Sequence, residues 1–336
     1  MTTPPLPDTQ KSLIFNVQTS ALSLTTSSPI PRAEEAGEHL IRVHSTAITN
    51  GELTWAPFVN WPIEHVPCYD VSGTIMTEVE GSKFKKGDKV YGRVVADREG
   101  TARQYATILP SEAARIPETL GMVDAATVPM SALTAWQAVF EKGGLSAVPY
   151  VSDDEGVVGG QAVGKRVLVL GAAGAVGSFA VQFAKIAGAF VVGTASVKNR
   201  TFLEERGVEV VDYTKTSMKD WVGGQEERKF DVVFDCVGGK SMLDGWNAVK
   251  SGGVYVSVVA GFKEPEGGKP AGVKTEWFIM ESRGEELKAI GMFIEKGLVK
   301  TSVDSVWTIE DYEKAFARTA TGHARGKVVM KIADEE

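Results

Sequence analysis

Two patterns of apolar and polar positions divide the chain. Up to about residue 125, short segments of strand-forming residues, such as 87–92 and 104–109, alternate with Gly and Pro turns. This part predicts a small β-rich domain. Farther along, short continuous apolar runs alternate with segments that carry apolar residues at helical spacing. That second pattern predicts an α/β fold with a doubly wound parallel sheet.

The most informative local pattern is a strand, a tight glycine turn and a helix. Residues 167–170 predict a buried parallel strand, and residues 178–188 carry apolar groups at helical spacing. The turn between them reads Ala-x-Gly-x-x-Gly from Ala172. Gly174 would admit a pyrophosphate to the helix N-terminus, and Gly177 would allow close helix–strand packing. The pattern predicts a dinucleotide site, against the alternative of an ordinary strand–helix turn, with contacts from Gly171, Ala173, Gly174, Ala175, Val176 and Gly177.

The segment after this helix indicates which dinucleotide binds. A second strand is expected over residues 189–194, and NAD sites carry an Asp or Glu at its end, about 20 residues after the first glycine. This chain has no acidic residue there before position 204. Hydroxyl and cationic donors instead suit a 2′-phosphate, so NADPH is the expected cofactor. The candidate donors are Ser196, Lys198, Asn199 and Arg200. The alternative interpretation is that Lys198 and Arg200 only form the solvated start of the next helix.

Three more strands and a closing helix complete the expected layout. The strands are predicted over residues 208–213, 230–238 and 252–261, and ligands of such sheets lie across the carboxyl ends of the strands. Residues 141–164 predict an exposed loop. Near the end of the chain, the pattern predicts an amphipathic helix over 309–318 and a strand over 327–332. The candidates for backbone contact with the cofactor are Val237, Gly238, Val259, Ala260 and Gly261.

Composition narrows the class of protein. With 336 residues, 43% of them hydrophobic, the chain can bury a large core and is expected to form two domains. A net charge of −7 argues against nucleic acid or an anionic membrane as partner. No apolar run approaches the roughly 18 residues of a membrane-spanning helix. Residues 1–10 lack signal-peptide features, and the two cysteines fit a reducing compartment, so a cytoplasmic protein is expected.

Several motifs together resemble one superfamily. They are residues 67–73 (Pro-Cys-Tyr-Asp-Val-Ser-Gly), 87–92, 133–136 (Leu-Thr-Ala-Trp), 231–238, 322–329 and the glycine turn. Over nearly its full length, the chain is similar to medium-chain dehydrogenase/reductases of the zinc-independent quinone oxidoreductase and enoyl reductase type, the branch that includes zeta-crystallin. The resemblance implies a GroES-like catalytic domain over residues 1–125 and 285–336 and a Rossmann NADP(H)-binding domain over residues 126–284. It leaves a homodimer open.

The resemblance also bears on metal binding. Zinc-dependent members place a ligand Cys in a Cys-x-Thr-Asp-like segment and a ligand His in Gly-His-Glu; the corresponding segments here are 49–52 and 68–70. Thr49 therefore replaces the Cys and Tyr69 replaces the His. The structural four-cysteine lobe is missing as well, and a catalytic zinc needs three N, S or carboxylate ligands. The expected site is metal-free, and Cys68 is expected to be a small core or pocket residue.

A metal-free site favours some reactions over others. Without a Lewis acid, oxidation of an unactivated alcohol is hard, whereas hydride transfer to an enone, an enal or a quinone is easier. The protein then needs a donor for the developing enolate oxygen. Tyr69 is the first candidate, although it could equally pack the cleft, and Asn50 is the second. Glu52 and Asp70 are expected to shape the loop or pair with a base, while Trp55, Phe58 and Trp61 could form an apolar pocket or core.

Cofactor residues carried over from the resemblance complete the expectation. Lys198 and Tyr213 match residues that bracket the adenosine 2′-phosphate, with Ser196 beside them. Thr134 matches a contact to the nicotinamide end. The C-terminal turn that returns over the cofactor corresponds to Arg325, Gly326 and Lys327. Two alternatives stay open: an NADPH-binding sensor or partner-binding protein with little turnover, and an alcohol or aldehyde oxidoreductase without zinc.

Overall fold

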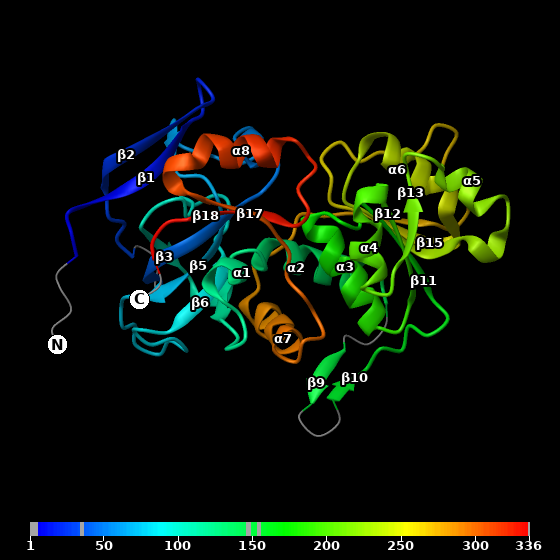
Figure 1. The fold of residues 1–336 in the computed structure, drawn as a ribbon, viewed down its shortest axis with the longest axis horizontal. Helices are drawn as coiled ribbons and strands as arrows, with labels where there is room; N and C mark the ends of the chain where they lie inside the picture. Colours follow the sequence, from blue (N-terminus) through cyan, green and yellow to red (C-terminus); the bar gives the residue numbers. More distant parts are fainter. Residues whose placement is uncertain (1–5, 34–36, 146–148, 153–155, 335–336) are drawn as a thin grey trace. The chain divides into compact units, whose positions relative to one another are not determined.

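The computed structural model describes residues 6–33, 37–145, 149–152 and 156–334. The chain divides into two compact units. Unit 1 holds residues 1–130, 282–295 and 301–336, and unit 2 holds residues 131–281 and 296–300. Figure 1 labels the helices and strands of both units.

Unit 2 is built on a parallel sheet of six strands in the order β13-β12-β11-β14-β15-β16. The first strand lies inside the sheet and the order reverses beside it, as expected for a doubly wound fold, so the predicted fold class is confirmed. The strands are β11 (Arg166–Leu170), β12 (Phe190–Ala195), β13 (Glu209–Asp212), β14 (Phe230–Asp235), β15 (Val249–Ser257) and β16 (Lys274–Trp277). The helices are α3 (Ala175–Ile186), α4 (Arg200–Glu204), α5 (Met218–Val222) and α6 (Gly239–Gly245).

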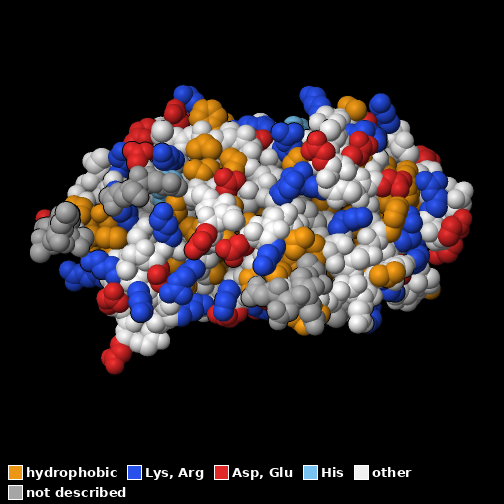
Figure 2. Space-filling view, turned by 60° about the horizontal axis from the view of Figure 1, so that its bottom comes forward, with side chains coloured by type: hydrophobic (Ala, Val, Ile, Leu, Met, Phe, Trp, Pro, Cys, Tyr) orange, Lys and Arg blue, Asp and Glu red, His pale blue; other side chains and the backbone are white. Residues whose placement is uncertain are grey.

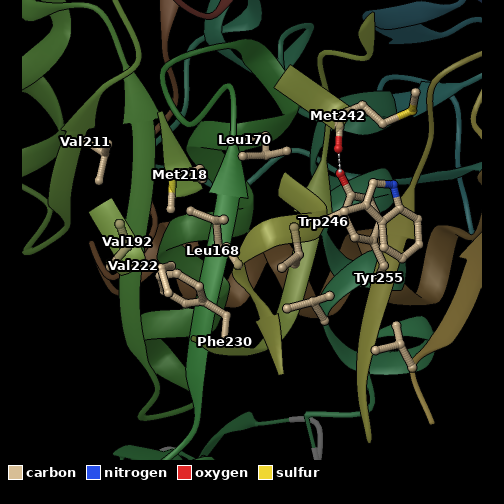
Figure 3. Packing of buried hydrophobic residues seen from close by; sticks show 14 residues of the cluster. Leu168, Leu170, Val192, Val211, Met218, Val222, Phe230, Met242, Trp246 and Tyr255 are labelled. Carbon is tan, nitrogen blue, oxygen red and sulfur yellow. Dashed lines mark hydrogen bonds between the residues drawn. The ribbon is translucent and has the colours of Figure 1, made fainter. Parts of the chain in front are cut away.

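The core of unit 2 forms where helices cover this sheet. Apolar side chains of β11, β12 and β14 pack against α5, α6 and the turn that precedes β15 (Figure 3). Trp246 stacks on Tyr255 with ring centroids 4.0 Å apart. The buried Tyr255 hydroxyl donates a hydrogen bond to the carbonyl oxygen of Met242 at 2.7 Å, which satisfies its polar end within the core.

Unit 1 is β-rich, as its sequence pattern predicts. Its largest sheet has seven strands, in the order β17-β18-β3-β5-β6-β8 with β7 paired to β3, and a three-stranded sheet has the order β2-β1-β4. The strands are β1 (Thr9–Asn16), β2 (Ala21–Pro29), β3 (His39–Ile48), β4 (Glu64–His65), β5 (Asp70–Ile75), β6 (Lys89–Arg93), β7 (Tyr105–Ile108), β8 (Ala113–Arg115), β17 (Val303–Thr308) and β18 (Lys327–Lys331). The helices are α1 (Met122–Ala125), α2 (Pro129–Trp136, which continues into unit 2), α7 (Gly284–Glu295) and α8 (Tyr312–Ala320).

Two local predictions need correction. Residues 141–164 are not wholly loop, because β9 (Tyr150–Ser152) and β10 (Gly156–Val158) pair as a short antiparallel hairpin and a π-helical turn runs over Gln137–Lys142. The strands are too short for an alternation signal. The helix expected over 309–318 begins with a 3-10 turn, and its α-helical part runs over Tyr312–Ala320.

The surface agrees with the charge argument. On the face drawn in Figure 2, basic and acidic side chains are interspersed. Such mixing offers no extended cationic surface to a polyanion on that face. None of the helices in the described ranges has the length and hydropathy that a membrane span requires.

Candidate functional site

The glycine turn joins β11 to α3 in unit 2. A Cβ on Gly177 would lie 2.2 Å from the Gly171 oxygen, so only glycine lets the helix approach the strand this closely. Gly171 has a φ of +79°, and a Cβ there would meet Val237 at 2.4 Å. At Gly174, by contrast, the nearest atom to such a Cβ is 3.4 Å away. Gly174 caps α3, and the first N–H groups of a helix have no partner within it, so the turn offers an open anion cradle.

The end of β12 shows why no acid stands there. Thr194, at 3% exposure, accepts a hydrogen bond from the backbone N–H of Gly171 on its Oγ1 at 3.0 Å, and its own carbonyl accepts from Ala172 at 3.1 Å. The threonine therefore holds the glycine turn instead of facing a ligand. The polar groups beyond it are more accessible: Ser196 is partly exposed, Lys198 is exposed, and Tyr213 is 53% exposed after β13.

The carboxyl ends of β14 and β15 adjoin the turn. Asp235 is fully buried and accepts hydrogen bonds from the N–H groups of Val237 and Gly238 on Oδ1, and from Ser257 Oγ on Oδ2. This shapes the loop so that Val237 is half exposed beside the glycine turn. Val259 and Gly261 follow β15, and the predicted backbone contacts thus come from strand ends that meet at one edge of the sheet.

In unit 1, strand pairing builds a row of polar residues. β18 pairs with β3 so that Val328 lies opposite Ile48, which sets Lys327 beside Thr49. β3 pairs with β5, and β5 pairs with β6, so that Asp70 lies opposite Arg93. Four elements that are far apart in the sequence thereby place two cations, a carboxylate and a hydroxyl along one edge of the sheet.

Lys327 is the centre of this row. Its Nζ lies 2.8 Å from Asp70 Oδ2 and donates to Thr49 Oγ1 at 2.7 Å. Asp70 Oδ1 also accepts from the N–H of Met130 at 2.6 Å. The sequence analysis placed Lys327 on the cofactor by resemblance, but its side chain is buried in this cluster and its charge is neutralised by Asp70. The expectation that Asp70 pairs with a base agrees with this contact.

Glu52 fixes the adjacent loop. Its carboxylate accepts hydrogen bonds from the N–H groups of Thr49 at 3.0 Å and Cys68 at 3.2 Å. Burial raises the pKa of Glu52 to about 7, against the opposing effect of these bonds. Cys68 is buried with a φ of +66°, a conformation that costs energy in a non-glycine residue and is sustained by this bonding. Cys68 is thus a core residue of the loop.

Tyr69 is hydrogen-bonded to a histidine that lies near a carboxylate, and neither neighbour was predicted. Its hydroxyl is 2.7 Å from His65 Nε2, and His65 Nδ1 lies 3.4 Å from Glu99 Oε1. The ring stacks between Trp55 and Trp61, with centroids at 5.6 and 6.2 Å. Burial raises the pKa of Tyr69 well above its usual value, so the phenol stays protonated. The side chain has 0% exposure in this structure, and its hydroxyl is already engaged.

The other predicted residues take varied positions. Asn50 is exposed in the loop before the 3-10 turn Glu52–Thr54. Phe58 is 79% exposed and is therefore not core, while Trp55 and Trp61 pack on Tyr69. Thr134 is buried in α2. Arg325 and Gly326 form the turn before β18, where Gly326 has a φ of +90° and a Cβ would meet the Ser302 oxygen at 2.0 Å.

The donor set near Thr49 does not suit zinc. The two positions that match ligands carry a hydroxyl and a phenol, and the hydroxyl of Thr49 is bonded to an ammonium. A positive charge against that position opposes a dication, which prefers thiolate, imidazole or carboxylate ligands. Within the described ranges, no three His, Cys, Asp or Glu side chains form a group that could hold a metal ion.

Sequence reasoning missed His65, Glu99 and Arg93. His65 stands in β4, a strand of only two residues, which is too short to give a pattern in the sequence. Glu99 lies in a loop that carries no periodic pattern. Arg93 directly follows the recognised segment 87–92, and nothing in that segment indicates that the arginine side chain is buried beside Tyr69. The pairing of β5 with β6 brings Arg93 close to Tyr69.

Comparison with known proteins gives consistent matches. Residues 207–330 match the family described as zinc-binding dehydrogenase. The chain is 44% identical to a probable zinc-binding oxidoreductase, mitochondrial, of Arthroderma benhamiae, over 97% of this chain and 98% of that protein. It is 33% identical to the 2-methylene-furan-3-one reductase of Solanum lycopersicum, over 80% of this chain and 64% of that protein.

A solved structure shares the fold along the whole chain. The quinone oxidoreductase of Coxiella burnetii superposes with a TM-score of 0.78, at 23% identity, over 97% of this chain and all 100% of that chain. At this identity the likeness shows the fold, and the family rests on the fungal relative. The chain therefore belongs to the zinc-binding dehydrogenase family, within the medium-chain dehydrogenase/reductase superfamily, and it is an oxidoreductase.

Proposed function

We propose that this protein is a zinc-independent, NADPH-dependent reductase of carbon–carbon double bonds conjugated to a carbonyl group, or of quinones. The observation that carries the proposal is the contact of Lys327 Nζ with Thr49 Oγ1, at 2.7 Å, where a zinc site would need a ligand. A site with fixed cations and a protonated phenol, but with no metal, suits hydride acceptors that are already electrophilic. The Solanum lycopersicum relative is named a reductase of an enone, which supports this substrate class.

The residues of unit 2 fit a phosphorylated dinucleotide. The N-terminus of α3 and the open space at Gly174 would hold the pyrophosphate, because the helix dipole and its free N–H groups attract an anion. Lys198 is exposed just beyond β12, and among the described residues no carboxylate lies within ion-pair distance of it. With Ser196 and Tyr213, it would bind the 2′-phosphate. The chemistry supplied by the nicotinamide, when bound, is hydride transfer.

Residues of unit 1 would manage the charge and the proton. Burial raises the pKa of Tyr69, so the phenol keeps its proton and can donate a hydrogen bond to the developing enolate oxygen. When both ring nitrogens of His65 carry protons, Nε2 donates to the Tyr69 oxygen and leaves the phenolic hydrogen for a substrate. Oε1 of Glu99 lies 3.4 Å from Nδ1 of His65. Asn50, exposed in the neighbouring loop, is the second candidate donor.

One observation favours a second candidate function, namely NADPH binding with little turnover. The Tyr69 side chain has no exposed surface, and its hydroxyl already has a partner in His65. A phenol held in this way donates to a substrate only after it rearranges. The expectation of a cytoplasmic protein stays a prediction, and the name of the fungal relative places that relative in mitochondria.

Oxidation of NADPH by the purified protein, measured against a panel of acyclic enals, cyclic enones and quinones, tests the proposal. We expect turnover that depends on one of these acceptors, and that a strong chelator does not reduce. NADPH binding without turnover on any acceptor would favour the second candidate. About one tightly held zinc per chain, with activity lost on its removal, would overturn zinc independence.

A further inference from the structure

A second buried cation lies near Tyr69 and lacks the partner that Lys327 has. Arg93 is 7% exposed at the end of β6, and its guanidinium lies 6.0 Å from the centre of the Tyr69 ring. Its Nη1 makes one long hydrogen bond, 3.3 Å, to Ser282 Oγ, and its buried Nε has no hydrogen-bond partner. Among the described residues, no carboxylate lies within ion-pair distance of this side chain.

The carboxylates around Arg93 are already engaged. Asp70, its partner across the ladder, binds Lys327 and the N–H of Met130. Glu112 binds Arg98 and accepts from the N–H groups of Val95 and Leu109. These two carboxylates, with Tyr69 and Asp97, favour the charged guanidinium from a distance, while burial lowers the pKa of Arg93. An arginine nevertheless stays protonated, so unit 1 holds a buried positive charge that has no ion-pair partner among the described residues.

Such a charge is costly to bury, and proteins retain one where it meets a complementary group. We propose that Arg93 binds the carbonyl oxygen of the substrate and stabilises the negative charge that develops on it during reduction. This inference rests on the proposed reductase function. Of the two buried cations in the row, Lys327 is neutralised by Asp70, so Arg93 is the one whose charge is available. Its planar fork of N–H donors also suits an enolate or quinone oxygen better than a single ammonium does.

The chemistry balances without a further reactant. When bound, the nicotinamide would supply a hydride to the β-carbon of the enone. The electron pair of the C=C bond would then shift toward the carbonyl, and Arg93 would bind the enolate oxygen that results. The guanidinium keeps its protons throughout. A proton then adds to the α-carbon, from Tyr69 or from water, and the carbonyl is restored. The substrate gains two electrons and the cofactor is oxidised.

Kinetics of Arg93→Gln and Arg93→Lys, with Arg103→Gln as the matched control, form the first test. Arg103 is also a buried arginine of unit 1, at 6% exposure. Its charge acts on Glu99, and among the described residues it makes no hydrogen bond or ring contact with Tyr69. We expect Arg93→Gln to lower kcat on an enone by about 100-fold, and Arg93→Lys to lower it less. The NADPH dissociation constant should change by less than about twofold, and Arg103→Gln should change kcat by less than about threefold. Equal losses in Arg93→Gln and Arg103→Gln would overturn the proposal.

Benzoate binding gives a readout that needs no turnover. Benzoate joins a planar anionic group to an apolar ring, as an enolate does, and Trp55 and Trp61 beside Tyr69 would report it by fluorescence. We expect saturable binding that weakens at least about tenfold in Arg93→Gln and is kept in Arg103→Gln. No binding to the wild type, or equal binding to Arg93→Gln, would overturn the inference. If benzoate binds through Arg93 while no acceptor is reduced, the proposed function fails and the anion site stands.

Discussion

The glycine turn of unit 2 and the polar cluster of unit 1 are built in opposite ways. The turn is made by consecutive residues, 171–177, whose backbone would bind the cofactor and whose glycines leave room for it. The cluster is made by side chains from β3, β5, β6 and β18, which meet only because the strands pair in one register. A backbone site depends on the space that its residues leave, whereas a side-chain site depends on how its charges are balanced.

The largest effect is expected where that balance breaks. Lys327→Met would leave Asp70 buried without its cation and should lower the free energy of unfolding by about 3–5 kcal/mol. Urea unfolding measures this. Lys331→Met is the control on the same strand, because Lys331 pairs with the exposed Asp334, and its effect should stay within about 0.5 kcal/mol. Similar losses in the two variants would show that the cluster is no more demanding than the surface.

Two alanine substitutions test how the space at the glycine turn affects stability and NADPH binding. Gly177→Ala should lower the free energy of unfolding by about 1–3 kcal/mol and weaken NADPH binding, because its Cβ would collide with the Gly171 oxygen at 2.2 Å. Gly174→Ala should weaken NADPH binding while stability changes by less than about 1 kcal/mol, since its Cβ meets nothing closer than 3.4 Å. Calorimetry measures the affinity of each variant for NADPH, and thermal unfolding measures its stability. Unchanged affinity in Gly174→Ala would remove this turn from the cofactor site.

Tyr69→Phe tests the chemistry assigned to the cluster. Loss of the hydroxyl should reduce turnover on a good acceptor by about 100-fold, with NADPH affinity kept within about twofold. His65→Gln should lose part of the same turnover, since it acts only through Tyr69. Steady-state kinetics with both variants measure this. A rate for Tyr69→Phe within a few-fold of wild type would move the donor role to Asn50, a backbone amide or water.

Lys198→Ala should have a small effect that is confined to the preference between the two cofactors. The unmodified protein should bind NADPH at least about tenfold more tightly than NADH, a difference of about 1.4 kcal/mol. Removal of this exposed ammonium should erase most of that preference and leave NADH binding nearly unchanged, because NADH has no 2′-phosphate. Titration of each cofactor by fluorescence measures both values. Equal affinities in the unmodified protein would contradict the assignment.

The contrast also explains what the sequence could reveal. The turn, its strand and its helix are contiguous, so spacing alone predicted them, and the parallel sheet followed from the same periodicity. The resemblance singled out Thr49, Tyr69 and Lys327 but did not indicate that Lys327 neutralises Asp70. The contacts of His65 and Arg93 with Tyr69 were not predicted, because they arise from tertiary packing and burial. No local pattern encodes such contacts.

The Thr194 hydroxyl sets a limit on redesign of cofactor preference. An engineer who wants NADH would place an acid at the end of β12, and position 194 is the apparent choice. At that position, however, a carboxylate would be buried and would displace the Oγ1 that accepts from Gly171. The same substitution would thus loosen the turn that receives the pyrophosphate of either cofactor. The acid belongs instead at Ser196, two residues farther on, where the side chain reaches solvent and the turn keeps its support.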